Sequence, residues 1–152
     1  VSQVFYSEVA NIGRSNPKKI KRLSIKLVKQ LSIIALIPLI TLLLFGPWLF
    51  SFVFGAEWYE AGIYARILSV MVYFHFIILP IGRVLEIFER QRESLLFNIV
   101  RLVMVISVFL VSRVFNFSSF LAVALYSLSN SIMYLALLLM VMKIMNQEIK
   151  RI

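Results

Sequence analysis

The sequence predicts an all-α, polytopic membrane protein with four transmembrane helices, and three observations support this prediction. The 152-residue chain is 61% hydrophobic and only 15% charged, so too few polar side chains exist to cover a water-facing surface. The stretch 31–56 contains no charged side chain. A helix needs about 20 apolar residues to cross a hydrocarbon core of about 30 Å, so this stretch is long enough. Three further apolar stretches follow it.

Glycine, asparagine and proline residues that end or start helices divide the chain into its expected elements. Residues 1–12 are expected to be the end of a helix, which Gly13 terminates. Residues 13–30 are expected to form a basic cytoplasmic loop, within which Asn16 can cap an interfacial helical stretch that starts at Pro17. The four expected spans cover residues 31–54, 61–82, 94–113 and 119–142.

The distribution of Lys and Arg predicts the topology. The net charge of +9 would suggest a nucleic-acid partner in a soluble protein, but in a membrane protein loop cations mark the cytoplasmic side, and no nucleic acid is expected. Seven basic residues lie in 14–29, three in 82–94 and three after residue 142, whereas the two opposite loops contain only Arg113. We therefore expect both ends of the chain, including the C-terminus, to be cytoplasmic.

The chain offers little for catalysis or metal binding. It has no Cys and no Asp, and its seven acids are all Glu. A membrane enzyme needs paired acids, a metal cluster or a long catalytic loop, so we expect no enzyme, no catalytic residue, no metal and no cofactor. The single histidine, His75, lies in the second span, where a neutral histidine bonded to a neighbouring helix is favoured over a proton or metal ligand.

Polar residues inside the spans are the candidate functional residues. An Arg at the bilayer centre costs on the order of 3 kcal/mol on insertion scales, so Arg66 and Arg101 are expected either to face a polar cavity or to extend toward the interface. The stripe Tyr126, Asn130 and Tyr134 repeats every four residues, which suits helix packing or a cavity wall. The substrate-cavity candidates are Arg66, Arg101, Asn98, Asn130 and Tyr126.

Proline and mixed charge mark two further features. Each proline inside a helix removes an amide donor, so Pro38, the pair Gly46 and Pro47, and Pro80 are candidate hinges. The connection 82–94 has charges of both signs, and its spacing predicts two ion pairs, Arg83 with Glu86 and Glu86 with Arg90.

Particular residues also suggest a family. The segments Val4 to Ala10 (VFYSEVA) and Leu42 to Leu68, followed by Pro80 and ERQRES, resemble the C-terminal part of bacterial polysaccharide-biosynthesis flippases. These are the Wzx-type flippases of the multidrug/oligosaccharidyl-lipid/polysaccharide (MOP) exporter superfamily. Ser7 departs from the pattern, because relatives often have Pro there. The strongest pieces of the resemblance are Phe54, Gly55, Trp58, Ala61, Gly62, Tyr64, Arg66 and Leu68.

The resemblance implies a larger transporter, of which residues 1–152 form the C-terminal membrane segment. Its fold would have twelve or more helices in two related halves, of which this chain holds the last third. Its function would be to move undecaprenyl-diphosphate-linked oligosaccharides across the bacterial inner membrane for surface polysaccharide assembly. Its partners would be the lipid-linked oligosaccharide, membrane lipids and the N-terminal half of the same chain, without which the fragment would be inactive. Arg66 and Arg101 are chemically suited to the diphosphate.

Two other functions stay open. A MATE-like small-molecule antiporter of the same superfamily is less favoured, because cation-coupled exporters generally need acids within the membrane and these spans have none. A structural membrane subunit is compatible with the polar stripe of the fourth span.

Overall fold

The computed structural model describes residues 2–12 and 16–151 and is all-α, as predicted. Four of its helices are long and apolar enough to cross a membrane, which identifies a multi-pass membrane protein. In chain order the elements are α1 (Ser2–Ile12), α2 (Pro17–Phe54), the 3₁₀ turn η2 (Ala56–Trp58), α3 (Tyr59–Gly82), α4 (Val84–Ile87), α5 (Gln91–Val114) and α6 (Ser119–Arg151).

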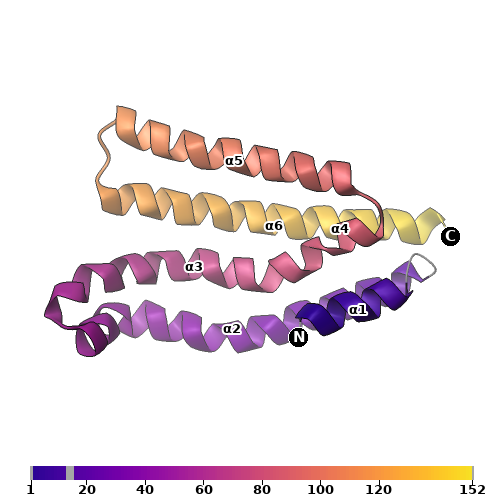
Figure 1. Cartoon of the computed structure of the whole chain (residues 1–152), viewed down its shortest axis with the longest axis horizontal. Coiled ribbons are helices and arrows are strands. Elements are labelled where there is room, and N and C mark those ends of the chain that lie inside the picture. The colour runs from indigo at the N-terminus through magenta and orange to yellow at the C-terminus, as the bar shows by residue number, and fades with distance from the viewer. Residues whose placement is uncertain (1, 13–15, 152) are drawn as a thin grey trace.

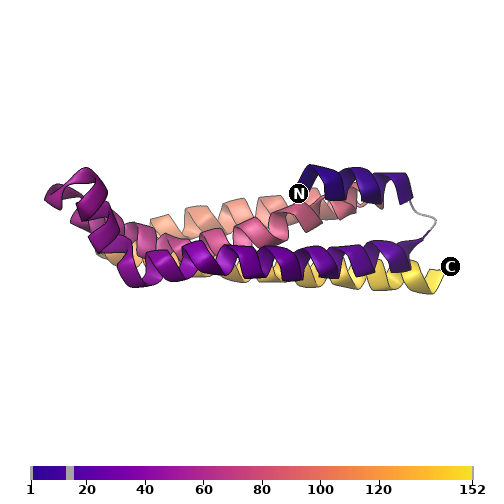
Figure 2. The ribbon, with the colours of Figure 1, turned by 90° about the horizontal axis from the view of Figure 1, so that it is seen from below.

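The four long helices lie side by side in a row, in the order α5, α6, α3, α2 (Figure 1). Seen edge-on, the row is thin, and α1 lies on one side of it beside the first part of α2 (Figure 2). The start of α2, the short helix α4 and the end of α6 share one end of the row (Figure 1). The most basic segments of the sequence therefore meet at this end, which we call the basic end.

The first turn of α2 forms as the sequence predicts. The side-chain Oδ1 of Asn16 accepts a hydrogen bond of 3.0 Å from the backbone amide of Lys19, and Pro17 occupies the first helical position, where its missing amide costs nothing. The expected basic loop 13–30 is therefore helix from Pro17 onward, and it continues the axis of the first span. Residues 13–15, including the expected helix end at Gly13, lie outside the described residues.

The helices are longer than the predicted spans. Because α2 has 38 residues, it is about 57 Å long at about 1.5 Å per residue, well beyond a hydrocarbon core of about 30 Å. The helix α6 likewise continues past the predicted end at residue 142, to Arg151. Both helices project at the basic end, where they touch: Nζ of Lys21 donates to Oδ1 of Asn146 at 2.7 Å.

Helical structure continues through all three predicted proline hinges. Pro38 and Pro47 lie inside α2 and Pro80 lies inside α3. The end of the α2–α3 pair that includes η2 turns out of the plane of the other helices (Figure 2). The candidate hinge Gly46 is buried beside Pro47 at this end, where α2 packs against α3.

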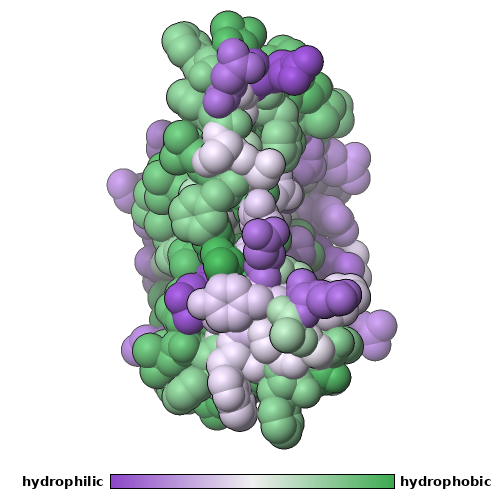
Figure 3. All heavy atoms as spheres, turned by 90° about the vertical axis from the view of Figure 1, so that its left-hand side faces the viewer, coloured by the Kyte–Doolittle hydropathy of each residue, from purple (hydrophilic) through white to green (hydrophobic). Residues whose placement is uncertain are grey.

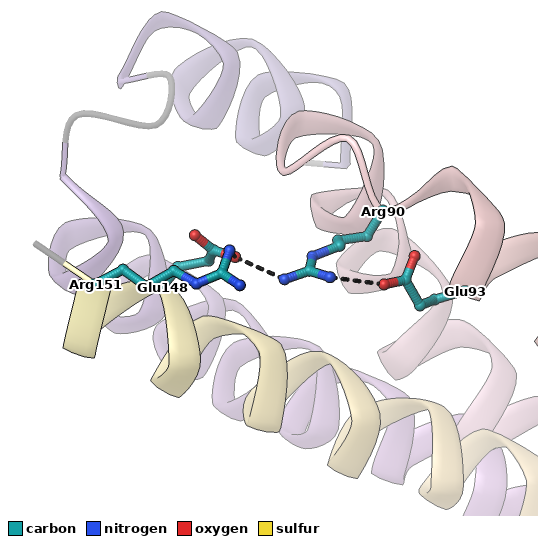
Figure 4. Close-up of polar contacts among 4 residues, drawn as sticks. All are labelled: Arg90, Glu93, Glu148 and Arg151. Carbon is teal, nitrogen blue, oxygen red and sulfur yellow. Dashed lines mark hydrogen bonds and ion pairs between the residues drawn. The ribbon is translucent and has the colours of Figure 1, made fainter.

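The connection between α3 and α5 pairs its charges differently from the prediction. Arg90 forms ion pairs with Glu93 at 2.8 Å and with Glu148 of α6 at 3.0 Å, and Glu148 also pairs with Arg151 at 3.2 Å (Figure 4). The carboxylates of Glu148 and Glu93 raise the pKa of Arg90 above its ordinary value. These contacts tie the start of α5 to the end of α6.

The two predicted ion pairs of this connection are wrong for the described residues. Glu89 has a φ of +54°, in the left-handed region, so the helix stops after α4 and Arg90 is no longer one turn from Glu86 on a common helix. Arg83 instead lies over the ring of Tyr6 in α1, with 5.9 Å between the guanidinium carbon and the ring centroid.

Both faces of the row leave large apolar side chains exposed. In α5 the buried residue is Ser112, while Leu102, Val103 and Leu110 are each more than half exposed. Seen from the η2 end, hydrophobic side chains cover most of the visible surface (Figure 3). A surface of this kind suits contact with lipid or with further helices, not with water.

Candidate functional site

Arg101 of α5 is held against α6 by two contacts. Its Nε donates a hydrogen bond of 3.0 Å to Oδ1 of Asn130, and its guanidinium carbon lies 4.7 Å from the centre of the Tyr134 ring. A cation above an aromatic face is attracted to the electron-rich ring, and the attraction grows when water is absent. Arg101 therefore turns inward onto α6.

A second contact extends this arrangement to α3. The phenol of Tyr134 hydrogen-bonds to Nδ1 of His75, and the two rings meet edge to face. Tyr134 and Asn130 are almost completely buried. Arg101, Asn130, Tyr134 and His75, which we call the polar cluster, thus connect α5, α6 and α3. The expectation that His75 bonds to a neighbouring helix is confirmed.

The four-residue spacing along α6 brings the side chain of Asn130 to the same helix face as Tyr126 and Tyr134. Tyr126, Asn130 and Tyr134 share one face because four residues make about one turn. The Nδ2 of Asn130 donates to the backbone oxygen of Tyr126 at 3.0 Å, and this bond orients the amide so that its Oδ1 meets Arg101. Asn130 is therefore satisfied on both sides, as a buried amide must be.

The serines beside this stripe pack α6 onto α3. Ser127 Oγ donates 2.7 Å to the backbone oxygen of Ile67, and Ser131 Oγ donates 2.8 Å to the oxygen of Ser127 within α6. Small hydroxyl side chains allow close helix approach and supply interhelical hydrogen bonds in lipid. The helix-packing interpretation of the stripe accounts for these residues.

The remaining candidates on α5 and α6 lie at the edge of the polar cluster. Asn98 is exposed and lines a shallow hollow together with Arg101, Leu102 and Val105. The ring of Tyr126 packs against Phe109, with 5.6 Å between the ring centres. Of the five predicted cavity residues, the structure brings Arg101 and Asn130 into direct contact, with Asn98 and Tyr126 next to them.

Arg66 lies apart from the polar cluster, where α3 meets α2. Its Nη2 donates 3.2 Å to the backbone oxygen of Leu44, and its Nε is buried without a partner. Pro47 lacks an amide, so the regular helix bond to the carbonyl of Leu43 cannot form, and Arg66 bonds the very next carbonyl. Arg66 therefore joins the two helices beside the proline.

The charge balance defines what the polar cluster can do. Within residues 2–12 and 16–151, no ion pair involves Arg66 or Arg101, and no group of His, Cys, Asp and Glu side chains could hold a metal ion. A guanidinium without a carboxylate partner among these residues, beside a surface hollow, is suited to binding an anion. Sequence reasoning missed Tyr134 and His75 as neighbours of Arg101, although the spacing of Tyr134 from Asn130 indicated that these two residues share one face of α6.

Comparisons of the chain with known protein families, with curated proteins and with solved structures gave no match.

Proposed function

We propose that this chain is the C-terminal membrane segment of a Wzx-type flippase. Such a protein carries undecaprenyl-diphosphate-linked oligosaccharides across the bacterial inner membrane. The observation that carries the proposal is Arg101, a cation within a candidate span that has no carboxylate partner among the described residues. The residue pattern around Trp58, which resembles that of this family, also supports the proposal.

The chemistry of the substrate explains why such an arginine is useful. A diphosphate crossing a medium of low dielectric needs nearby positive charge to offset the loss of water. Arg101 supplies this charge, and Asn130 and Tyr134 hold its side chain without neutralising it. The hollow bordered by Arg101 and Asn98 is the place where a phosphate oxygen would meet the guanidinium.

The open faces of the row fit a larger assembly. Large apolar side chains remain exposed on α2, α3, α5 and α6, and helices from an N-terminal half of the same protein would cover part of them. In this proposal the basic end faces the cytoplasm, and α2 starts there. The two halves would then enclose the substrate between them.

The decisive experiment changes Arg101 in the full-length protein and measures surface polysaccharide in the cell. Arg101→Ala should abolish polymer at unchanged expression, whereas Arg113→Ala, which changes an exposed arginine in the last turn of α5, should leave polymer intact. Unchanged polymer in the Arg101 variant would reject the proposed role. Transport of small molecules by proteoliposomes that contain no lipid-linked sugar would favour the antiporter instead.

A further inference from the structure

The C-terminal part of α6 carries a groove that the polar cluster does not use. Its polar residues are exposed and recur at spacings of three or four residues, which places them on one helix face. The lining residues of this α6 groove are Leu139, Met142, Lys143, Asn146, Gln147 and Lys150.

The lining of the α6 groove changes from apolar to cationic along the helix axis. Leu139 and Met142 are apolar, whereas Lys143 and Lys150 are cations separated by about 10 Å of helix rise. About 20 residues from the start of α6 at Ser119 cross the hydrocarbon core, so Lys143 lies at the depth of the headgroup layer, which is about 5–8 Å thick on each side. Lys150 lies farther out, and because the Cα–Cβ bonds of a helix tilt toward its N-terminus, its long side chain can extend back toward the headgroups. The groove thus matches a lipid in both polarity and depth.

A contact from α2 sets the hydrogen-bonding character of the groove. Nζ of Lys21 donates to Oδ1 of Asn146 at 2.7 Å. An amide has one acceptor oxygen and one donor nitrogen, so this bond commits the oxygen and leaves the N–H groups for a ligand. Together with Lys143 and Lys150, Asn146 therefore offers donors to an anion.

The acid nearest to this segment does not oppose an anion. Glu148 does not line the α6 groove, and its carboxylate pairs with Arg90 and Arg151 (Figure 4). Its negative charge is thereby offset, and the lining of the groove contains two cations and no carboxylate.

We propose that the α6 groove binds an anionic phospholipid of the leaflet that faces the basic end. The phosphate would lie between Lys143 and Lys150, with donors from Asn146, and an acyl chain would follow Leu139 and Met142. Charge complementarity and the match in depth select a lipid. This inference does not depend on the proposed transport function.

The test uses the full protein, purified in mild detergent and mixed with equal amounts of phosphatidylglycerol and phosphatidylcholine. Native mass spectrometry then counts the lipids that stay bound. The wild type should retain phosphatidylglycerol preferentially. A lysine near an anionic surface contributes roughly fivefold in affinity, so Lys143→Gln with Lys150→Gln should weaken retention by up to roughly 30-fold. The matched control, Lys18→Gln with Lys19→Gln, removes two exposed lysines outside the groove and should keep the preference.

A second variant separates the site from general charge. Asn146→Asp keeps a partner for Lys21 but replaces amide donors by a carboxylate, so it too should abolish the preference. Equal losses in the groove and control variants would overturn the proposal in favour of diffuse attraction, as would a wild type without preference. The variant Gln147→Cys should react with maleimide in lipid-free detergent, and a failure to react would also overturn the proposal, because protein would then fill the groove.

Discussion

The backbone of Gly62 on α3 lies directly against Pro47 on α2. A Cβ atom at position 62 would fall 2.5 Å from the Cα of Pro47 and 2.7 Å from the backbone oxygen of Gly46, closer than atoms can approach. Glycine at this position is therefore required by the contact between two backbones. The Gly46–Pro47 pair is first of all a packing point between α2 and α3.

Replacing Gly62 with Ala should force α2 and α3 apart. Overpacking of this kind typically costs about 1–3 kcal/mol, and the cost should appear as a lower melting temperature of the full protein in detergent. Gly82→Ala is the control, because its Cβ would meet Leu137 Cδ2 at an ordinary 3.4 Å. Equal melting temperatures for the two variants would show that the close approach is not maintained.

Asn130→Leu should loosen α5 from α6. The change removes the oxygen that accepts from Nε of Arg101 and leaves a charged donor without its partner. Cysteines placed in α5 and α6 should then cross-link more slowly than in the parent protein. Asn98→Leu is the matched control, since Asn98 is exposed, and unchanged cross-linking in the Asn130 variant would contradict the contact.

Ser127→Ala should lower stability slightly but measurably. Its hydroxyl bonds the backbone oxygen of Ile67 on another helix, and interhelical bonds in membranes average about 0.6 kcal/mol. Ser107→Ala removes a hydroxyl that bonds only within its own helix, to Val103, and should have no such effect on helix association. Unfolding of both variants in mixed micelles measures the difference, and a larger loss for Ser107 would refute the assignment.

The topology can be tested by labelling, because this sequence contains no Cys. In a full-length background freed of other cysteines, Lys19→Cys should react with a membrane-impermeant maleimide only from the cytoplasmic side. Glu57→Cys, in the η2 turn, should react only from the opposite side. Labelling of both positions from one side would contradict the odd number of crossings between them.

The sequence predicted what depends on local pattern. Hydropathy alone located four spans, and the neighbouring Asn16 and Pro17 predicted the start of α2, because capping and fixed φ act within one turn. The end of α6 was missed, since the polar residues after Met142 are good helix formers that hydropathy does not reveal.

Contacts between helices were harder to predict. The expected ion pair of Glu86 with Arg90 does not form because of one residue, Glu89, whose left-handed backbone ends the helix before Arg90. The shared face of Asn130 and Tyr134 was visible in their spacing, but the partners of that face depend on which helix lies next to α6. No local pattern encodes the order of helices in a row, so the contact of His75 with Tyr134 required the structure.

The position of α5 at the edge of the row has a consequence for assembly. Lipid solvates exposed apolar side chains about as well as another helix does, so burial contributes little to keeping α5 in place. Its alignment with α6 relies on two polar anchors, Arg101 on Asn130 within the membrane and Arg90 on Glu148 at the basic end. Two anchors on a helix fix its register, so a sliding movement of α5 along α6 must break both of them together.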